Sequence, residues 1–303
     1  MNDVSAGHAG RLLASKQGFD ILDCEVCGFA HVVPMPNVEE LASLYKHEFY
    51  GRDKPFYFEQ YEEDSDWWSE VYKERLEYLS YLKDPSSLSL VDIGSGPGLF
   101  LKVAETMGFQ SAGIEPSDMA VEYSRGKGLT VYSGLLDEDA VSLVGQCDLV
   151  HMSAVLEHVP DAKRTLELVF QMLHENGQVC VVVPNDFNEL QKILRDFEGY
   201  ESWWVAPPHH LNYFTFDSLD YLMKSVGFEI IKRTTTFPME WFLLSGDNYV
   251  DNPELGRVCH SRRKRFELAL ANAGQRELKA EIYSNLAELG LGREIVIYAR
   301  KPA

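Results

Sequence analysis

The stretch Val91-Asp92-Ile93-Gly94-Ser95-Gly96-Pro97-Gly98 decides the fold of this 303-residue chain. Its first residues predict a buried strand, and the alternating glycines predict a tight turn whose backbone can approach a ligand closely. A helical pattern over residues 99–107 comes next, and the first N–H groups of a helix point toward whatever lies over such a turn. The strand–turn–helix order therefore predicts an α/β fold with a ligand site at this turn.

A carboxylate at the end of the next predicted strand indicates the kind of ligand. Glu115 comes about 20 residues after the turn, where an acid accepts hydrogen bonds from ribose hydroxyls. The glycine spacing is G-x-G-x-G rather than the G-x-G-x-x-G of dinucleotide sites, and Asp92 precedes it. A carboxylate there repels a pyrophosphate and suits a cationic amino group. We expect a nucleoside ligand with an ammonium group and no phosphate, the alternative being a tight turn without a ligand.

With these residues in place, the sequence resembles the class I S-adenosylmethionine (SAM)-dependent methyltransferases of the methyltransferase-23 type. Residues 91–98 match the first motif, 147–152 the fourth strand, 154–159 the "LEHV" segment and 178–184 the fifth strand. The resemblance covers roughly residues 70–235 and the last dozen. It implies a doubly wound, Rossmann-like sheet of seven strands whose last strand is antiparallel.

The pattern along the chain agrees with that fold. Apolar strands alternate with helices from Leu88 onward, which predicts a parallel sheet with helices on both faces. Residues 228–234 and 294–299 are the expected sixth and seventh strands, and we expect them to be neighbours. We predict a small N-terminal cap over residues 1–83, with helical spacing at 38–49, and a SAM-binding domain over 84–303 with a helical insertion at 237–290.

The resemblance also implies which residues bind the cofactor. Asp92 and the backbone of the glycine turn are expected at the methionine end, and Glu115 at the ribose. Met119 and Leu135 are expected to flank the adenine, although both could be core residues, and Ser153 is expected near the sulfonium. The predicted cofactor residues are Asp92, Gly94, Ser95, Gly96, Gly98, Glu115, Met119, Leu135 and Ser153.

Three histidines are candidates for the base that removes a proton from a methyl acceptor, a task that histidine suits at neutral pH. His158 follows the fourth strand, at the edge where the methyl group is expected. His209 and His210 lie in Pro207-Pro208-His209-His210-Leu211-Asn212-Tyr213-Phe214, which resembles the H-E-H-x-x-Y-F element of sugar C-methyltransferases. That resemblance implies a base at His210, while His209 replaces the acid of the family element and is expected to contact substrate. The alternative for each is a structural hydrogen bond at a helix end.

Four further residues are expected on the acceptor side. Asn185 begins the loop after the fifth strand, and Trp204 and Tyr213 are expected to line the acceptor, with packing as the alternative. Arg262 belongs to the basic run Arg262-Arg263-Lys264-Arg265, which could hold a phosphate or carboxylate of the acceptor. The alternative for that run is a solvated helix face paired with nearby acids.

The pair Cys24-x-x-Cys27, followed by Gly28, resembles half of the zinc ribbon that several sugar methyltransferases carry at the N-terminus. A structural zinc site needs four ligands, and a second cysteine pair is missing upstream, where the chain offers His8. With only His8 or His31 to complete the set, we expect a relic of the ribbon that keeps the turn and binds no metal.

Composition limits the partners. Lys and Arg number 28 against 47 Asp and Glu, a formal net charge of −19, which argues against nucleic acid or an anionic membrane surface. The lack of a transmembrane-length apolar run and of a signal-peptide pattern makes the cytoplasm the expected location. The sequence gives no indication of the oligomeric state.

Together these features predict an enzyme that transfers a methyl group from SAM to a small molecule, with a sugar or nucleotide-linked sugar as the leading acceptor and a histidine as base. The full sugar C-methyltransferases carry a further C-terminal Rossmann-type domain that is missing here, so O-methylation is at least as plausible. The alternatives are a SAM-binding scaffold without activity and a nicotinamide-dependent oxidoreductase, which Asp92 disfavours.

Overall fold

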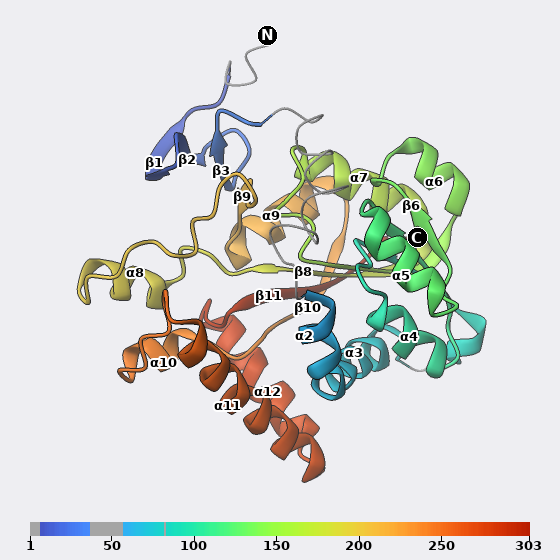
Figure 1. The fold of residues 1–303 in the computed structure, drawn as a ribbon. Helices are drawn as coiled ribbons and strands as arrows, with labels where there is room; N and C mark the ends of the chain where they lie inside the picture. Colours follow the sequence, from blue (N-terminus) through green and yellow to red (C-terminus); the bar gives the residue numbers. More distant parts are fainter. Residues whose placement is uncertain (1–6, 37–56, 82) are drawn as a thin grey trace.

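The computed structural model describes residues 7–36, 57–81 and 83–303. Its central sheet contains β4 (Ser89–Ile93), β5 (Gln110–Glu115), β6 (Val131–Ser133), β7 (Cys147–Ser153), β8 (Leu173–Pro184), β10 (Glu229–Thr235) and β11 (Glu294–Arg300). These seven strands have the order β10-β11-β8-β7-β4-β5-β6 (Figure 1). The strands from β8 to β6 are parallel, and β11 is antiparallel to both β8 and β10. The predicted fold class is confirmed, including the adjacent sixth and seventh strands.

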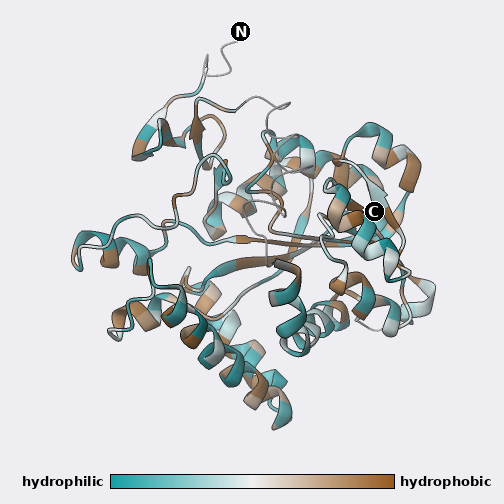
Figure 2. Cartoon of the chain, viewed as in Figure 1, coloured by the Kyte–Doolittle hydropathy of each residue, from teal (hydrophilic) through white to brown (hydrophobic). Residues whose placement is uncertain are grey.

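Both faces of this sheet are buried under helices. On β8, Val181 and Val183 belong to one hydrophobic cluster while Cys180 and Val182 belong to another, because successive strand side chains point to opposite faces. The first cluster includes α7 (Ala162–Met172) and α9 (Phe216–Val226), and the second includes α3 (Ser65–Leu79), α4 (Leu99–Thr106) and α5 (Asp118–Gly126). A further helix, α6 (Glu138–Val144), packs beside α7. Figure 2 shows the resulting hydrophobic colouring along the central strands.

A second, smaller sheet joins the N-terminal segment to the main domain. It consists of β1 (Gly10–Lys16), β2 (Phe19–Cys24), β3 (Ala30–Val33) and β9 (Asn212–Tyr213), in that order. The pairs Ala30–Tyr213 and His31–Asn212 connect the N-terminal hairpin to a strand that lies far along the chain, after β8. The cap is therefore completed by a strand of the main domain.

The structure also differs from the simple division at residue 83. The helix α3 lies before that boundary, yet its residues Tyr72, Leu76 and Leu79 are buried in the core of the main sheet. A short helix, α2 (Tyr57–Glu63), precedes it, and η2 (Pro85–Ser87) leads into the sheet. The predicted helical segment at 38–49 lies outside the described residues.

The segment between the last two strands is helical. It contains α10 (Glu240–Leu244), α11 (Pro253–Asn272) and α12 (Arg276–Glu288), and α8 (Glu189–Asp196) packs against α10. Figure 1 shows α11 and the small N-terminal sheet at opposite ends of the molecule. The carboxyl ends of β4, β5 and β7 meet at one edge of the main sheet, where an open α/β fold binds its ligands.

Candidate active site

The glycine turn follows β4 directly, and its backbone needs glycine. Gly94, Gly96 and Gly98 have φ values of 69°, 51° and 79°, in the left-handed region that other residues rarely adopt. The amide of Gly94 donates to the carbonyl of Ile114 at 2.8 Å, which ties the turn to β5. A Cβ added at Gly94 would lie 2.5 Å from Cγ2 of Val155, so the turn also packs against the segment after β7. The turn therefore connects the three strand ends that surround the site.

Glu115 closes one side of this turn. Its two carboxylate oxygens accept hydrogen bonds from the amides of Gly96 at 2.8 Å and Ser117 at 2.9 Å. Only 4 % of the residue is exposed, and this burial raises the pKa of its carboxyl to about 7. Each carboxylate oxygen retains a second lone pair, so the group can still accept hydrogen bonds from a ribose.

Asp92 has a different environment from the expected one. Its carboxylate oxygen lies 2.7 Å from Nδ1 of His151, and Nε2 of His151 lies 3.2 Å from Nη1 of Arg75. Asp92 and His151 are register partners on adjacent strands, so their side chains meet on the same face of the sheet. The expectation that Asp92 meets a ligand directly is therefore corrected: the side chain is 3 % exposed and is bound to His151.

The remaining predicted cofactor residues lie around the turn. Met119 and Leu135 are 46 % and 43 % exposed, which leaves their surfaces available to an adenine ring. Ser95 is buried, and its Oγ has no hydrogen-bond partner among the described residues. Oγ of Ser153, at the end of β7, lies 3.5 Å from Nη1 of Arg75. A glycine turn, a buried acid and exposed apolar groups are the features that a SAM site requires, so the residues present fit this cofactor.

On the acceptor side, the structure brings two of the three predicted histidines together. The rings of His158 and His210 are 5.0 Å apart and nearly perpendicular. The amide of His158 donates to the carbonyl of Val155, the residue that contacts Gly94, so the histidine pair begins one turn away from the glycine loop. His209 contributes its backbone: its carbonyl oxygen lies 2.7 Å from Nδ1 of His158.

That last contact determines the protonation of His158. A carbonyl oxygen only accepts hydrogen bonds, so Nδ1 of His158 must carry the proton. In the neutral ring Nε2 is then the nitrogen without a proton, which is the form that a general base needs. The sequence predicted a histidine here, and the tertiary structure defines which nitrogen is basic.

The structure adds Glu157, which the sequence analysis passed over although it belongs to the LEHV segment. One of its carboxylate oxygens lies 3.8 Å from Nε2 of His158, and one ligand-capable atom each from Glu157, His158 and His210 lie within 4.8 Å of one another. The side chain is almost fully buried, and burial raises its pKa to about 8. Its position directly before His158 was the available signal in the sequence.

The backbone around this cluster is held by Asn212. Its side-chain amide donates to the carbonyls of Leu156 and Val159 at 2.9 and 2.7 Å. The amides of Leu211 and Asn212 both donate to the carbonyl of Glu157. The segment after β7 and the segment before β9 thus form one hydrogen-bonded unit that carries the histidines.

Four predicted acceptor residues have structural contacts instead. The side chain of Asn185 is buried and donates to the carbonyls of Gly290 and Gly292. The hydroxyl of Tyr213 donates to the carbonyl of His210 and accepts from the amide of Ala206. Their expected contact with substrate is corrected to a role in holding loops. These positions are buried because the chain returns over them, which no local pattern shows.

Trp204 and Arg262 also differ from the expectation. Trp204 is 3 % exposed in the hydrophobic cluster of the small sheet. Arg262 is on α11, and its Nη1 lies 2.6 Å from a carboxylate oxygen of Asp247, with both side chains partly in solvent. This is the alternative of a solvated helix face paired with acids.

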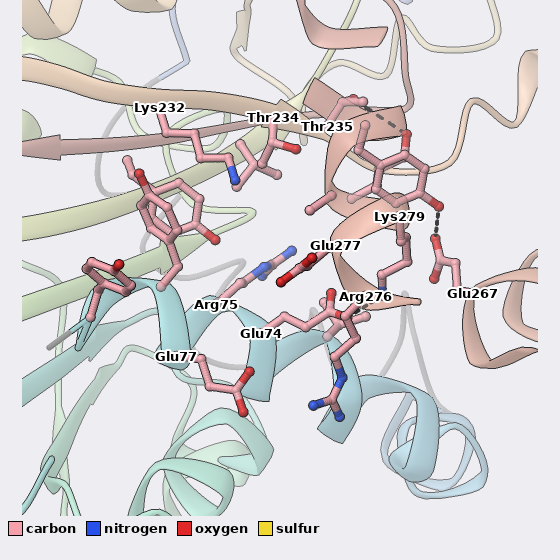
Figure 3. Close-up of a pocket in the computed structure, with 18 of the residues that line it drawn as sticks. Glu74, Arg75, Glu77, Lys232, Thr234, Thr235, Glu267, Arg276, Glu277 and Lys279 are labelled. Carbon is pink, nitrogen blue, oxygen red and sulfur yellow. Dashed lines mark hydrogen bonds and ion pairs between the residues drawn. The ribbon is translucent and has the colours of Figure 1, made fainter. Parts of the chain in front are cut away.

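A cavity of about 330 Å³ lies beside the site, between α3, β10 and the helices of the insertion (Figure 3). Its charged residues are largely paired with each other, for example Lys279 with Glu74 at 2.5 Å. Arg75 lines this cavity and also contacts His151 and Ser153. Through this one buried side chain, the cavity adjoins the cofactor side of the sheet.

The comparisons with known proteins agree with this geometry. Residues 61–233, more than half of the chain, match the family profile described as a methyltransferase domain. A curated relative, the ubiquinone biosynthesis O-methyltransferase of Aromatoleum aromaticum, is 26 % identical over 132 residues, which are 42 % of this chain and 53 % of the relative. The chain thus spans about half the length of the curated relative that it matches.

Two solved structures show the same fold. A SAM-dependent methyltransferase from Archaeoglobus fulgidus superposes with a TM-score of 0.53 at 18 % identity, covering 81 % of this chain and all of that one (100 %). The magnesium protoporphyrin IX methyltransferase of Synechocystis PCC 6803, with bound S-adenosylhomocysteine, superposes with a TM-score of 0.54 at 13 % identity, covering 88 % and 100 %. In the described part of the chain, we find no helix with the length and apolar character needed to cross a membrane. The glycine turn, the acid after β5 and the family match together show that this chain belongs to the class I SAM-dependent methyltransferases.

Proposed function

We propose that this methyltransferase transfers the methyl group to a hydroxyl of a small-molecule acceptor and that His158 and His210 form its basic centre. The observation that carries this proposal is the hydrogen bond from Nδ1 of His158 to the carbonyl of His209, because it leaves Nε2 as the basic nitrogen. Bound S-adenosylmethionine supplies an electrophilic methyl group on its sulfonium. A hydroxyl is a weak nucleophile that must lose its proton, and an imidazole is suited to accept it.

The transfer balances with these groups. The acceptor oxygen forms a bond to the methyl carbon while the carbon–sulfur bond breaks, leaving a neutral thioether. The hydroxyl proton moves to Nε2 of His158 and makes an imidazolium. Glu157 lies 3.8 Å from this nitrogen. Burial keeps its carboxyl protonated near neutral pH, and the imidazolium that forms beside it lowers the pKa of the carboxyl, so that its carboxylate can pair with the new positive charge.

Oxygen as the acceptor atom is supported by the curated relative, which is named an O-methyltransferase. The preference for a sugar or a nucleotide-linked sugar rests on the resemblance of residues 207–214 to the histidine element of sugar methyltransferases. In this structure that segment carries His210 and is bonded to the LEHV segment through Asn212. Sugars and nucleotide-linked sugars are therefore the first acceptors to test.

The test is transfer of tritium from methyl-labelled SAM to a panel of sugars, nucleotide-linked sugars and phenols. The informative variant is His158→Asn, because the amide nitrogen of Asn occupies the place of Nδ1 and keeps the bond to His209 while Nε2 is lost. We expect His158→Asn to lower kcat by about 100-fold or more, the range of general base catalysis, with unchanged SAM affinity. His210→Ala is expected to lower kcat as well. The matched control is His174→Asn on the exposed part of β8, which should retain full activity.

The alternatives give different results. A structural role for His158 predicts that His158→Asn is active and only His158→Ala is impaired, which would contradict the proposed base. A binding scaffold predicts SAM binding by calorimetry with no transfer to any acceptor of the panel. An oxidoreductase predicts binding of NADH in the same calorimetric titration.

A further inference from the structure

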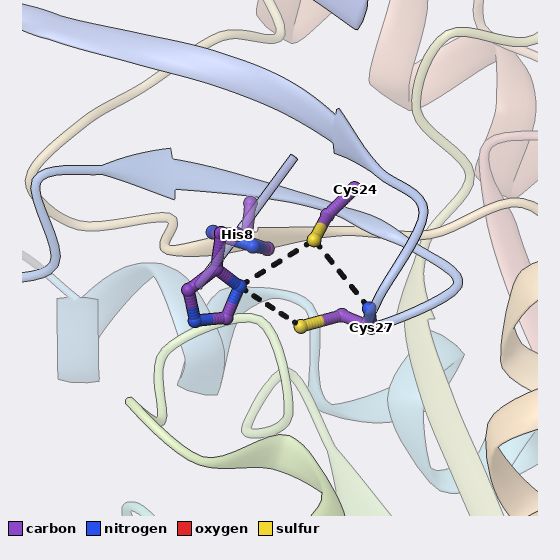
Figure 4. Close-up of side chains that lie close together, drawn as sticks. His8, Cys24 and Cys27 are labelled. Carbon is purple, nitrogen blue, oxygen red and sulfur yellow. Dashed lines mark hydrogen bonds between the residues drawn. The ribbon is translucent and has the colours of Figure 1, made fainter. Parts of the chain in front are cut away.

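Four side chains with metal-binding atoms come together beside the small N-terminal sheet. His8, Cys24, Cys27 and His31 each offer one such atom, and these atoms lie within 4.8 Å of one another. Figure 4 shows His8 pointing toward both sulfur atoms. His8 precedes β1, Cys24 ends β2, Cys27 is in the following turn and His31 lies in β3. The residues converge because these strands are hydrogen-bonded neighbours.

The turn between β2 and β3 presents its two sulfurs together. Gly28 has a φ of 76°, and its amide donates to the carbonyl of Cys24 at 2.9 Å, which closes the turn. The amide of Cys27 points at Sγ of Cys24 at 3.4 Å, a contact that stabilises negative charge on the sulfur. Nδ1 of His8 is 3.4 Å from each of the two sulfurs. These contacts bring Nδ1 of His8 and the two sulfurs around one point.

His31 provides an independent observation. The residue is 3 % exposed, and its Nδ1 lies 2.9 Å from the carbonyl of Val32, which only accepts hydrogen bonds. Nδ1 therefore carries the proton, and Nε2 has a lone pair. Nε2 is buried and has no hydrogen-bond partner among the described residues. A buried acceptor without a partner destabilises the folded state, and coordination to a cation removes this cost.

The geometry corresponds to tetrahedral coordination. With zinc–sulfur bonds of about 2.3 Å and zinc–nitrogen bonds of about 2.0 Å, the ligand atoms of a tetrahedron are about 3.3–3.8 Å apart. The contacts of His8 to both sulfurs, 3.4 Å each, already have this separation. The widest separation in the cluster, up to 4.8 Å, requires the remaining atoms to move inward by about 1 Å.

The charge of such a site also suits its burial. Two thiolates and two neutral imidazoles around a divalent ion give zero net charge, so no uncompensated charge is placed inside the sheet. The hydrogen bond from His31 to Val32 is the kind of outer contact that orients a histidine ligand. Mixed sulfur and nitrogen ligands in a tetrahedron favour zinc over harder cations.

We propose that His8, Cys24, Cys27 and His31 bind one structural zinc ion. The sequence alone predicted a relic without metal, because the upstream cysteine pair is missing and only His8 or His31 was available to complete the set. The tertiary structure brings both histidines to it. The site has four protein ligands and no open position, which makes it structural rather than catalytic.

The zinc ion would also act on the acceptor side of the enzyme. His31 pairs with Asn212 of β9, and the side chain of Asn212 holds the segment that carries Glu157 and His158. Phe29, between the cysteines and His31, packs on Phe214 with ring centroids 5.1 Å apart. Metal binding therefore stabilises the strand next to His210 by holding its neighbour in place.

The test is the metal content of the purified full-length chain, measured by plasma mass spectrometry after dialysis and after zinc titration of chelator-treated protein. We expect one zinc per chain, and X-ray absorption should show two sulfur and two nitrogen ligands. His8→Ala, Cys27→Ser and His31→Gln should each lose at least tenfold in zinc affinity. Cys259→Ser replaces a buried cysteine of α11 outside the cluster and should keep one zinc.

Wild-type protein that takes up no zinc on titration would overturn the proposal. So would zinc binding that survives in all three cluster variants. His8 precedes β1 and is only partly buried, so His8→Ala should fold even if the other variants do not. Because metal content is measured directly, the result does not depend on whether the proposed acceptor chemistry is correct.

Discussion

Nδ1 of His151 lies 2.7 Å from a carboxylate oxygen of Asp92, directly beneath the glycine turn. On its other side the same ring meets the guanidinium of Arg75, which only donates hydrogen bonds. His151 is therefore neutral, with the proton on Nδ1, and burial lowers its pKa accordingly. The ring also stacks on Phe100, with ring centroids 3.8 Å apart. Arg75, His151 and Asp92 thus form a buried polar chain that runs from α3 through β7 to β4 and supports the turn.

This row of hydrogen-bonded side chains predicts the effect of replacing His151. His151→Leu should destabilise the protein by about 3 kcal/mol, because it leaves the charges of Asp92 and Arg75 buried without their bridge. His151→Gln should lose less stability, since the amide of glutamine offers a donor and an acceptor to the same partners. Urea unfolding of both variants measures the difference. Equal losses would show that the hydrogen-bonded bridge contributes little.

The glycine turn predicts a steric effect that can be separated from backbone strain. Gly98 and Gly128 have similar φ values, 79° and 85°. A Cβ at Gly98 would lie 2.4 Å from Cδ1 of Leu129, whereas Gly128 has no atom within 4 Å of that position. Both alanine variants should lose about 1–2 kcal/mol of stability, because a residue with a Cβ is strained in the left-handed conformation. Gly98→Ala should lose a further 1–3 kcal/mol, roughly, from overpacking.

The measurement is thermal unfolding of the two glycine variants, together with calorimetric titration of S-adenosylhomocysteine. Gly128→Ala should retain cofactor affinity, and Gly98→Ala should weaken it because the turn shifts. If the two variants were equally stable, the close packing around Gly98 would not matter.

Glu115 predicts a pH dependence of cofactor binding. The ribose hydroxyls donate hydrogen bonds, so they bind the ionised carboxylate in preference to the protonated form. With the pKa of Glu115 at about 7, affinity for S-adenosylhomocysteine should be about tenfold lower at pH 6 than at pH 8. Glu115→Gln should bind more weakly and lose this dependence. A wild-type affinity that is the same at both pH values would contradict a ribose contact at Glu115.

Glu157 predicts a pH dependence of stability. Its pKa is raised by burial to about 8, so between pH 5 and pH 7 the folded state keeps a proton that the unfolded chain has lost. The contribution of this group to the free energy of unfolding therefore falls as pH rises, by about 1.4 kcal/mol per pH unit. Glu157→Gln carries no titrating group, so its stability should fall less steeply over this range. Denaturant unfolding at pH 5, 6 and 7 compares the two slopes, and parallel slopes would show that Glu157 is ionised in the folded protein.

Much of the fold followed from local patterns. The apolar strands, the glycine turn and the acid of Glu115 are contiguous signals, and they sufficed for the seven-stranded sheet and its cofactor. Asn185, Trp204 and Tyr213 were predicted at the acceptor because of their positions in the chain, yet each is buried in contacts with distant segments. Asp92 was predicted to face a ligand, but its register partner His151 takes that place.

The sequence by itself determined the class of the sheet and the methyl donor, because strand periodicity, glycine conformation and the spacing to an acid act over short stretches of chain. Only the tertiary structure decided which nitrogen of His158 is basic, that Glu157 lies beside it, and that His8 and His31 both reach the cysteine pair. These relationships depend on hydrogen bonds and burial between segments that are far apart in sequence. Protonation and coordination are set by that surrounding structure.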